Sequence, residues 1–170
     1  MKKKILSFVL AGFIVLGLTG CGKPKVFKYM EKLEPSQSLE EMNKIIGFEG
    51  TLRSDENSYK TYEWKISDDT SISAQFMLNY KTATITANYP STMASHKANF
   101  KKWDEIKSKL NKKETITYKE FVKLVGGANG TIKQKTSDTT SYTWYNADGG
   151  YLTAYFSTET GKCTMATGGF

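Results

Sequence analysis

The sequence predicts an α+β protein made of two tandem repeats, each a helix-loop-helix packed on a four-stranded antiparallel sheet. The first observation is a duplication, because residues 38–47 recur 79 positions later as residues 117–126. Further along, Tyr62 and Trp64 match Tyr142 and Trp144 at an offset of 80 that needs no further gap. The second observation is that apolar residues have helical spacing at the start of each copy and alternate afterwards. Aromatic matches at one offset are rare by chance, so we expect two copies of one folding unit.

Residues 1–20 have the pattern of an export signal. Three lysines follow Met1, and residues 5–18 form an apolar run that is too short for a comfortable membrane-spanning helix. The run ends in Leu18-Thr19-Gly20-Cys21, which resembles the lipobox of bacterial lipoproteins. This resemblance implies cleavage before Cys21 and attachment of its sulfur to a diacylglycerol. The alternative is an ordinary signal peptide with a coincidental Cys at its end.

Acylation of Cys21 would make membrane lipid the first partner of this chain. Residues 21–26 would form a lipidated tether on the outer face of the cytoplasmic membrane, with a Gram-positive cell surface as the expected setting. Lys23, Lys25 and Lys28 could contact anionic head groups or wall polymers, at about 1 kcal/mol each. The alternative is that they only make the tether soluble and positively charged.

The charge balance does not favour nucleic-acid binding. The formal net charge is +7, and three of the positive charges lie in the predicted signal. Arg53 is the only arginine among 24 basic residues, so no arginine-rich surface is expected. We therefore expect no nucleic-acid partner.

Residues 27–90 form the first predicted repeat, residues 91–98 a linker, and residues 99–170 the second repeat. Each repeat is expected to begin with a short amphipathic helix, whose apolar residues are Phe27, Met30 and Leu33 in the first copy and Phe100, Trp103, Ile106 and Leu110 in the second. A second helix should follow, because each copy then has an S/T-x-x-E capping box at the start of the helix and a glycine at its end. These residues are Ser38, Glu41 and Gly47 in the first copy, and Thr117, Glu120 and Gly126 in the second.

After the helices the period of the sequence becomes two, which predicts half-buried antiparallel strands. The first repeat has three such stretches, at residues 62–66, 72–78 and 83–87, separated by turns at residues 67–70 and 79–81. A short strand around Leu52 precedes them. The same alternation makes Trp64 and Trp144 core residues. It also places Cys163 at the inward position of Ala83, where a thiol behaves as a small hydrophobe.

With these elements the chain resembles the β-lactamase inhibitory proteins, and more closely the small Gram-positive lipoproteins that share their repeat. The resemblance covers residues 27–170 and rests on the two helix-loop-helix and sheet units, the glycine after each second helix and the Y-x-W strand. It implies a concave sheet surface that binds an enzyme, with an Asp on a hairpin of the first repeat entering the active site. Asp69, seven positions before Phe76, matches that residue, and Asp68 precedes it. Thr70 and Ser71 replace the aromatic residues that follow this Asp, and the disulfide of each inhibitor repeat has no cysteines here.

Strand alternation also points to a recognition surface on the second repeat. If Trp144 faces the helices, then Tyr145, Tyr151 and Tyr155 lie on the opposite, uncovered face of the sheet. The matching positions of the first repeat hold Lys65, Ser71 and Gln75. Exposed tyrosines are typical of recognition surfaces. The alternatives are cross-strand pairing on a solvated sheet, or coverage of one sheet by the other.

No catalytic pattern is present in the sequence. There is no G-x-S-x-G or H-E-x-x-H motif, and His96 is the only histidine. Asp68 and Asp69 could bind a cation weakly, but no 12-residue calcium loop surrounds them. We therefore expect a protein-binding module that is not an enzyme and needs no cofactor. Its expected partner is another exported protein, such as a β-lactamase or a transpeptidase. The alternative is a scaffold lipoprotein for envelope assembly or stress, without an enzyme target.

Overall fold

The structure is a computed structural model that describes residues 22–78 and 81–170. The predicted signal, its cleavage point and Cys21 lie outside the described residues, as do Asn79 and Tyr80 of one predicted turn. Within the described ranges, no helix has the length and apolar character needed to cross a membrane.

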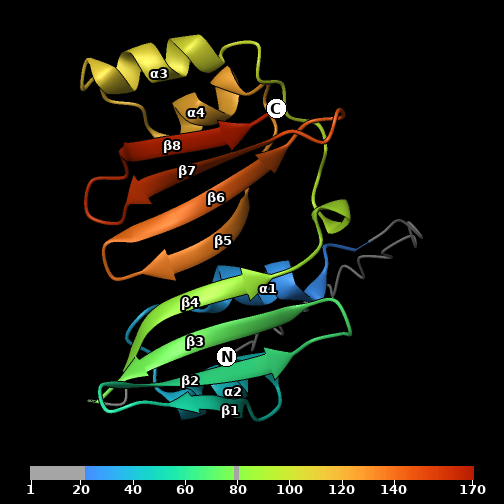
Figure 1. Cartoon of the computed structure of the whole chain (residues 1–170), viewed down its shortest axis with the longest axis vertical. Helices are drawn as coiled ribbons and strands as arrows, with labels where there is room; N and C mark the ends of the chain where they lie inside the picture. The colour runs from blue at the N-terminus through green and yellow to red at the C-terminus, as the bar shows by residue number, and fades with distance from the viewer. Residues whose placement is uncertain (1–21, 79–80) are drawn as a thin grey trace, which may run out of the picture.

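Two helices and four strands form each half of the described chain (Figure 1). The first half, residues 22–90, contains α1 (Lys25–Lys32), α2 (Leu39–Ile46), β1 (Thr51–Asp55), β2 (Tyr59–Lys65), β3 (Ser71–Met77) and β4 (Thr82–Asn88). A linker with a short 3₁₀ helix, η1 (Ser91–Met93), leads to the second half, residues 99–170. That half contains α3 (Trp103–Asn111), α4 (Tyr118–Leu124), β5 (Thr131–Thr136), β6 (Thr139–Tyr145), β7 (Tyr151–Ser157) and β8 (Cys163–Gly169).

The predicted fold, in which each repeat has its own four-stranded sheet, is wrong. All strands form a single eight-stranded antiparallel sheet in the order β1 to β8. β4 pairs with β5 through Thr84 with Thr136, Ile85 with Lys135 and Thr86 with Gln134. Two separate sheets would leave the backbone groups of these edge strands without strand partners, and pairing satisfies them. The alternation of apolar and polar residues within a strand does not indicate which strand lies beside it, so it could not predict the β4–β5 pairing.

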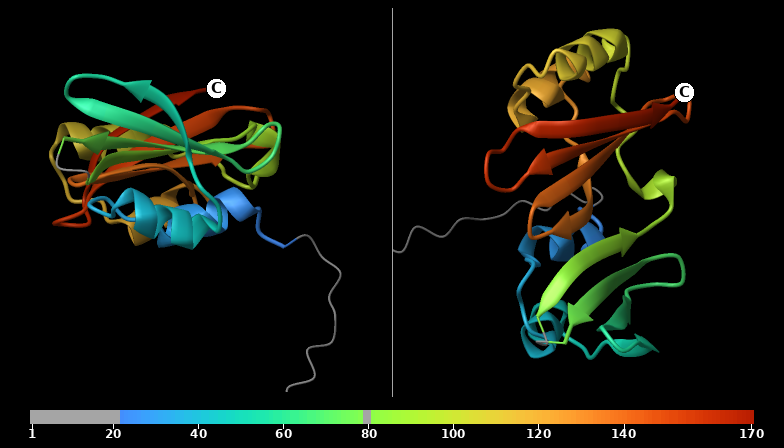
Figure 2. Two further views of the ribbon diagram at one scale, coloured as in Figure 1. Left: turned by 90° about the horizontal axis from the view of Figure 1, so that it is seen from below. Right: turned by 60° about the vertical axis from the view of Figure 1, so that its left-hand side comes forward.

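The helices of both halves pack on the same face of the sheet. In the first half, Met30 and Met42 from the helices pack with Trp64 from β2 in one buried cluster. In the second half, Phe121 from α4 packs with Trp144 from β6 in another. Both tryptophans are buried, as predicted. Figure 2 shows α1 and α2 on one side of the sheet and its other face turned away from them.

The second helix of each half begins at the predicted capping box. The Ser38 hydroxyl accepts a hydrogen bond from the Glu41 backbone N–H at 3.2 Å, and the Glu41 carboxylate accepts one from the Ser38 N–H at 2.7 Å. Thr117 and Glu120 make the same reciprocal pair before α4. Gly47 ends α2 with a φ of 93°, a left-handed conformation that suits glycine.

Equivalent bulges shift the register of the last strand in each half. Phe76 pairs with Thr82, and Phe156 pairs with Cys163. Cys163 therefore corresponds to Thr82 and not to Ala83 as predicted, because a single offset cannot describe an extra residue in the second copy. Cys163 is buried as expected. Beyond the bulge, however, Met165 is turned to the opposite face and is 48% exposed.

A buried lysine joins the two halves on the helix side of the junction. The Lys135 ammonium group donates hydrogen bonds to the Leu33 carbonyl at 2.7 Å and to the Glu34 carboxylate at 2.6 Å. Only 7% of the Lys135 side chain is exposed, against 60% for Glu34. The second half thus donates to the residues that follow α1, and the two halves are held together by polar contacts as well as by strand pairing.

Candidate functional site

Polar residues line most of the sheet face opposite the helices, which we call the open face, although Ser71, Ser141 and Thr143 on it are buried. By strand register, Ser73, Thr86, Gln134 and Ser141 form one row across β3 to β6. The Gln134 amide donates to the Thr86 hydroxyl at 3.4 Å, so the row continues across the junction between the halves. Joining the two halves in one sheet therefore creates a larger surface than either half could offer.

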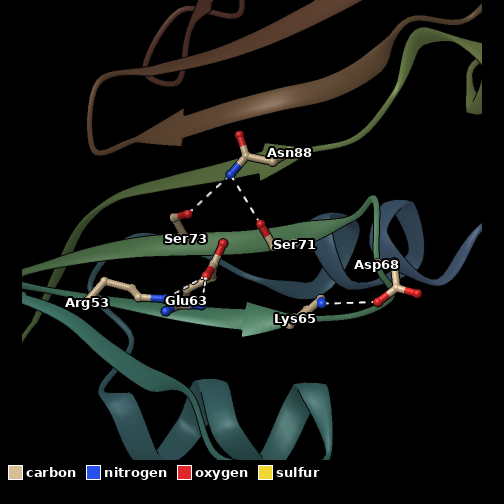
Figure 3. A network of polar contacts seen from close by, with 7 residues as sticks. All are labelled: Arg53, Glu63, Lys65, Asp68, Ser71, Ser73 and Asn88. Carbon is tan, nitrogen blue, oxygen red and sulfur yellow. Dashed lines mark hydrogen bonds and ion pairs between the residues drawn. The ribbon is translucent and has the colours of Figure 1, made fainter.

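The first half of the open face carries an ordered polar network (Figure 3). Arg53 contacts the Glu63 carboxylate with two nitrogens, at 2.7 and 2.6 Å. The Asn88 amide lies 3.4 Å from the Ser71 hydroxyl and 3.2 Å from the Ser73 hydroxyl. A hydrogen bond with Ser71 and the Arg53 guanidinium hold the pKa of Glu63 below its ordinary value, although partial burial opposes this. Glu63 is therefore a charged acceptor fixed in place by its neighbours.

Asp68 and Asp69 lie in the turn between β2 and β3. The Asp68 carboxylate is 3.1 Å from the Lys65 ammonium group, and its side chain is 96% exposed. Asp69 is also exposed. Their turn and the β6–β7 turn lie at the same end of the sheet but in different halves (Figure 1). The structure thus places both carboxylates on the end of a hairpin and away from the predicted tyrosines.

Of the three predicted tyrosines, Tyr151 and Tyr155 lie on the open face of β7. Tyr151 is 47% exposed, and its ring lies over Gly169, where a Cβ atom would be 3.0 Å from the ring. Tyr155 is half-buried and pairs with Met165 of β8. We call Tyr151, Tyr155 and Met165 the tyrosine patch. Met165 was missed at the sequence level, because the bulge that turns it outward has no signal in the alternation of residues.

Tyr145 has contacts within the chain. Its ring stacks on His96 of the linker at a centroid distance of 5.5 Å, and it packs against the first core cluster. The two ring nitrogens of His96 lie 3.0 Å from the carbonyl oxygens of Asn146 and Ser91. Burial is the main cause that raises the pKa of Tyr145. Stacking of Tyr145 on His96 therefore holds the linker against β6, and only part of the Tyr145 ring faces solvent.

A cavity of about 750 Å³ opens on the helix side where α1 faces β5 and β6. Its lining includes Glu31, Glu34, Lys135, Tyr118 and Tyr142. Burial raises the pKa of both tyrosines, so each stays a neutral hydroxyl at ordinary pH. No local pattern in the sequence indicates this cavity, because its walls come from both halves and depend on the β4–β5 pairing.

Among the described residues, neither Cys163 nor His96 is placed as an activated nucleophile or as its base. Burial raises the pKa of the Cys163 thiol to about 11, so it stays protonated at neutral pH. His96 faces two backbone carbonyls and a tyrosine ring, which are not nucleophiles that it could activate. Residues 22–78 and 81–170 contain no group of three His, Cys, Asp or Glu side chains placed to hold a metal ion.

Comparison with known proteins gives no match, either to a protein-family model or to a curated protein. The resemblance to the β-lactamase inhibitory proteins therefore stays a prediction.

Proposed function

We propose that this chain is a membrane-anchored extracytoplasmic lipoprotein that binds another exported protein through the open face and catalyses no reaction. The observation that carries this proposal is the difference between the halves at matching strand positions. Tyr151 and Tyr155 stand in β7 where β3 has Ser71 and Gln75, in the same pairing register. Ser71 in β3 is a small buried side chain, whereas Tyr151 at the matching position of β7 is a large ring that is 47% exposed, and this difference points to a contact outside the chain.

The physical properties of the tyrosine patch support a binding role. Tyr151 and Met165 are each about half exposed, at 47% and 48%, and lie on neighbouring strands. Tyrosine rings have few rotatable bonds, so a partner gains contact area at a small cost in conformational entropy. The tyrosine hydroxyl groups can both donate and accept hydrogen bonds. A mixed aromatic and polar surface of this kind suits a folded protein partner.

The proposed partner is an exported enzyme such as a β-lactamase or a transpeptidase. Asp69 is exposed at the end of the β2–β3 hairpin, where a carboxylate could enter a cleft that accepts an anionic group. Asp68 beside it is paired with Lys65. The proposal therefore assigns the insertion to Asp69 and the broader contact to the tyrosine patch.

A binding experiment on the full chain in detergent tests this proposal. Proteins captured from membranes are identified, and the chain is titrated against a panel of β-lactamases and transpeptidases. Replacing Tyr151→Ser and Tyr155→Gln installs the residues of the first half at both positions. We expect about 30-fold weaker binding for each true anchor, equivalent to about 2 kcal/mol. Lys119→Ala, on the exposed surface of α4, is the matched control and should leave the affinity unchanged.

Two outcomes would contradict the proposal. Unchanged affinity in the double tyrosine variant would remove the tyrosine patch from the interface. No binding across the enzyme panel, together with capture of envelope-assembly proteins, would favour the scaffold alternative.

A further inference from the structure

We infer that a second copy of this chain docks end to end on the sheet, with the outer edge of β8, the last strand of the described sheet, pairing with β1 of the next copy. The basis is the junction inside the chain, where β4 pairs with β5. The two halves have the same order of elements, so β8 corresponds to β4 and β1 corresponds to β5. The two outer edges of the sheet thus repeat two surfaces that already bind each other.

The edge of β8 repeats the edge of β4. At the start of β4, the Thr82 N–H donates to the Gln37 carbonyl at 3.1 Å. At the start of β8, the Cys163 N–H donates to the Ile116 carbonyl at 2.8 Å, from the matching loop. Beyond this point residues 84–86 pair with β5, whereas residues 165–167 lie on the last strand of the described sheet. The length of edge that binds β5 in the first half is therefore available in the second.

The edge of β1 repeats the edge of β5. Both strands contain a bulge at the same place, between Leu52 and Ser54 in β1 and between Ile132 and Gln134 in β5. A bulge often protects an edge strand, but β5 pairs with β4 despite it. Ile132 packs against the core of the first half, while its counterpart Leu52 is 45% exposed. β1 therefore presents an apolar side chain at the position that the internal junction covers.

The helices and charges at the two ends also fit this arrangement. α1 contacts both β4 and β5 at the junction in the middle of the sheet, while α3 contacts β8 at the edge of the sheet (Figure 1). In the junction, Lys135 of β5 pairs with Glu34, which follows the C-cap of α1. At the two outer edges of the sheet, the β1 position that matches Lys135 holds Asp55. The position that matches Glu34 holds Lys113, which follows the C-cap of α3. The ion pair can thus form between copies with its signs exchanged, and Asp55 can keep its 2.9 Å contact with Lys60.

The proposed contact joins two different surfaces, so each added copy leaves the same two edges free. Such a heterologous interface builds open chains or closed rings. It would also extend the open face from one copy to the next. This inference does not depend on the lipid anchor or on the exported partner.

Disulfide cross-linking of the full chain tests the inference. The variant Ser54→Cys with Thr167→Cys places thiols where the proposed strands should face each other, at the positions that correspond to the Gln134–Thr86 pair. Paired strands bring Cα atoms within the range that a disulfide spans. We expect a ladder of covalent multimers on a non-reducing gel after mild oxidation. Each single variant should give no more cross-linking than the unaltered chain, and a mixture of the two single variants should give only dimers.

A matched internal control calibrates the chemistry. Thr86→Cys with Gln134→Cys should close a disulfide within one chain, because those residues are paired in the structure. If this pair closes while the Ser54 and Thr167 double variant stays monomeric, the inference is wrong. Equal dimer yields from Ser54→Cys alone would show pairing of two β1 edges and would also overturn it.

Exchanging the charges of Asp55 and Lys113 gives a second test of the proposed contact, and it leaves the backbone edges of the strands unchanged. Asp55→Lys in the cross-linking background should reduce multimer yield at least about tenfold. Adding Lys113→Asp should restore it, since the pair then has the signs of the internal junction. Failure of the second change to restore the yield, with circular dichroism unchanged, would contradict the proposed contact.

Discussion

The substitution Asn43→Val is expected to destabilise the first half of the sheet. The Asn43 side-chain oxygen accepts hydrogen bonds from Trp64 Nε1 at 2.8 Å and from the Gly50 N–H at 3.1 Å. Trp64 is fully buried and its ring lies directly against Gly50, where a Cβ atom would be 2.6 Å from the ring. Water therefore cannot replace the acceptor that Trp64 Nε1 loses without displacing the ring.

Valine is the residue that the second half has at the matching position of its helix, Val122. In that half, Trp144 Nε1 donates to the Ala128 carbonyl at 2.8 Å and needs no side chain on α4. Asn43→Val thus keeps a side chain that suits the helix but removes an acceptor that only the first half requires.

The expected loss follows from the two donors. A buried donor without a partner costs about 1–3 kcal/mol. The Gly50 N–H is only partly buried and can recover part of this from water. We therefore expect the free energy of unfolding to fall by about 2–4 kcal/mol, and Tm to fall by roughly 5–15 °C for a chain of this size.

Urea and thermal unfolding, followed by circular dichroism, measure this change. Asn43→Asp is the control, because it keeps an acceptor oxygen and should cost less than about 1 kcal/mol through its charge at a helix C-terminus. A loss below about 0.5 kcal/mol for Asn43→Val, which is the range of ordinary surface changes, would refute the reasoning.

Three further predictions concern the junction, the helix caps and the thiol. Lys135→Met should lower the free energy of unfolding by about 1–3 kcal/mol in urea titrations. Lys135→Glu should lower it by more, because the new carboxylate faces Glu34. Equal effects of the two changes would contradict this prediction. Capping hydrogen bonds lower the pKa of Glu41 and Glu120 below the ordinary 4.5. The two ionised carboxylates therefore stabilise the folded chain above that pH, and this contribution is lost as the pH falls through the lowered pKa. Replacing both by Gln should flatten the loss of stability in acid, and parallel pH profiles would argue against the effect. Because burial raises the pKa of Cys163 to about 11, iodoacetamide at neutral pH should label it only in denaturant, as followed by peptide mass spectrometry; rapid labelling of the folded chain would show that the thiol is accessible.

Features that depend on neighbours in the sequence were predicted well. The capping boxes at Ser38 and Thr117 join residues three positions apart, so the sequence alone identifies the start of α2 and α4. The burial of Trp64 and Trp144 followed from alternation within single strands. These features need no knowledge of what lies beside the element.

The candidate site was predicted only in part. Tyr151 is on the exposed side of β7, as its position in the strand indicates. The packing of Tyr145 on His96 depends on the path of the linker, which no local pattern describes. The outward turn of Met165 depends on a bulge that matters only when β7 and β8 are paired. Each of these results from contacts between segments and not from the residues of one segment.

The sequence by itself determined the duplication, the helices and strands and the burial of their apolar sides, because capping and periodicity act within a few residues of one another. Tertiary structure alone decided that β4 and β5 join the halves into one sheet, with Lys135 buried at the junction. The physical reason is that backbone hydrogen bonding between strands is nearly independent of sequence. The choice of partner therefore depends on which edges the packed helices leave open.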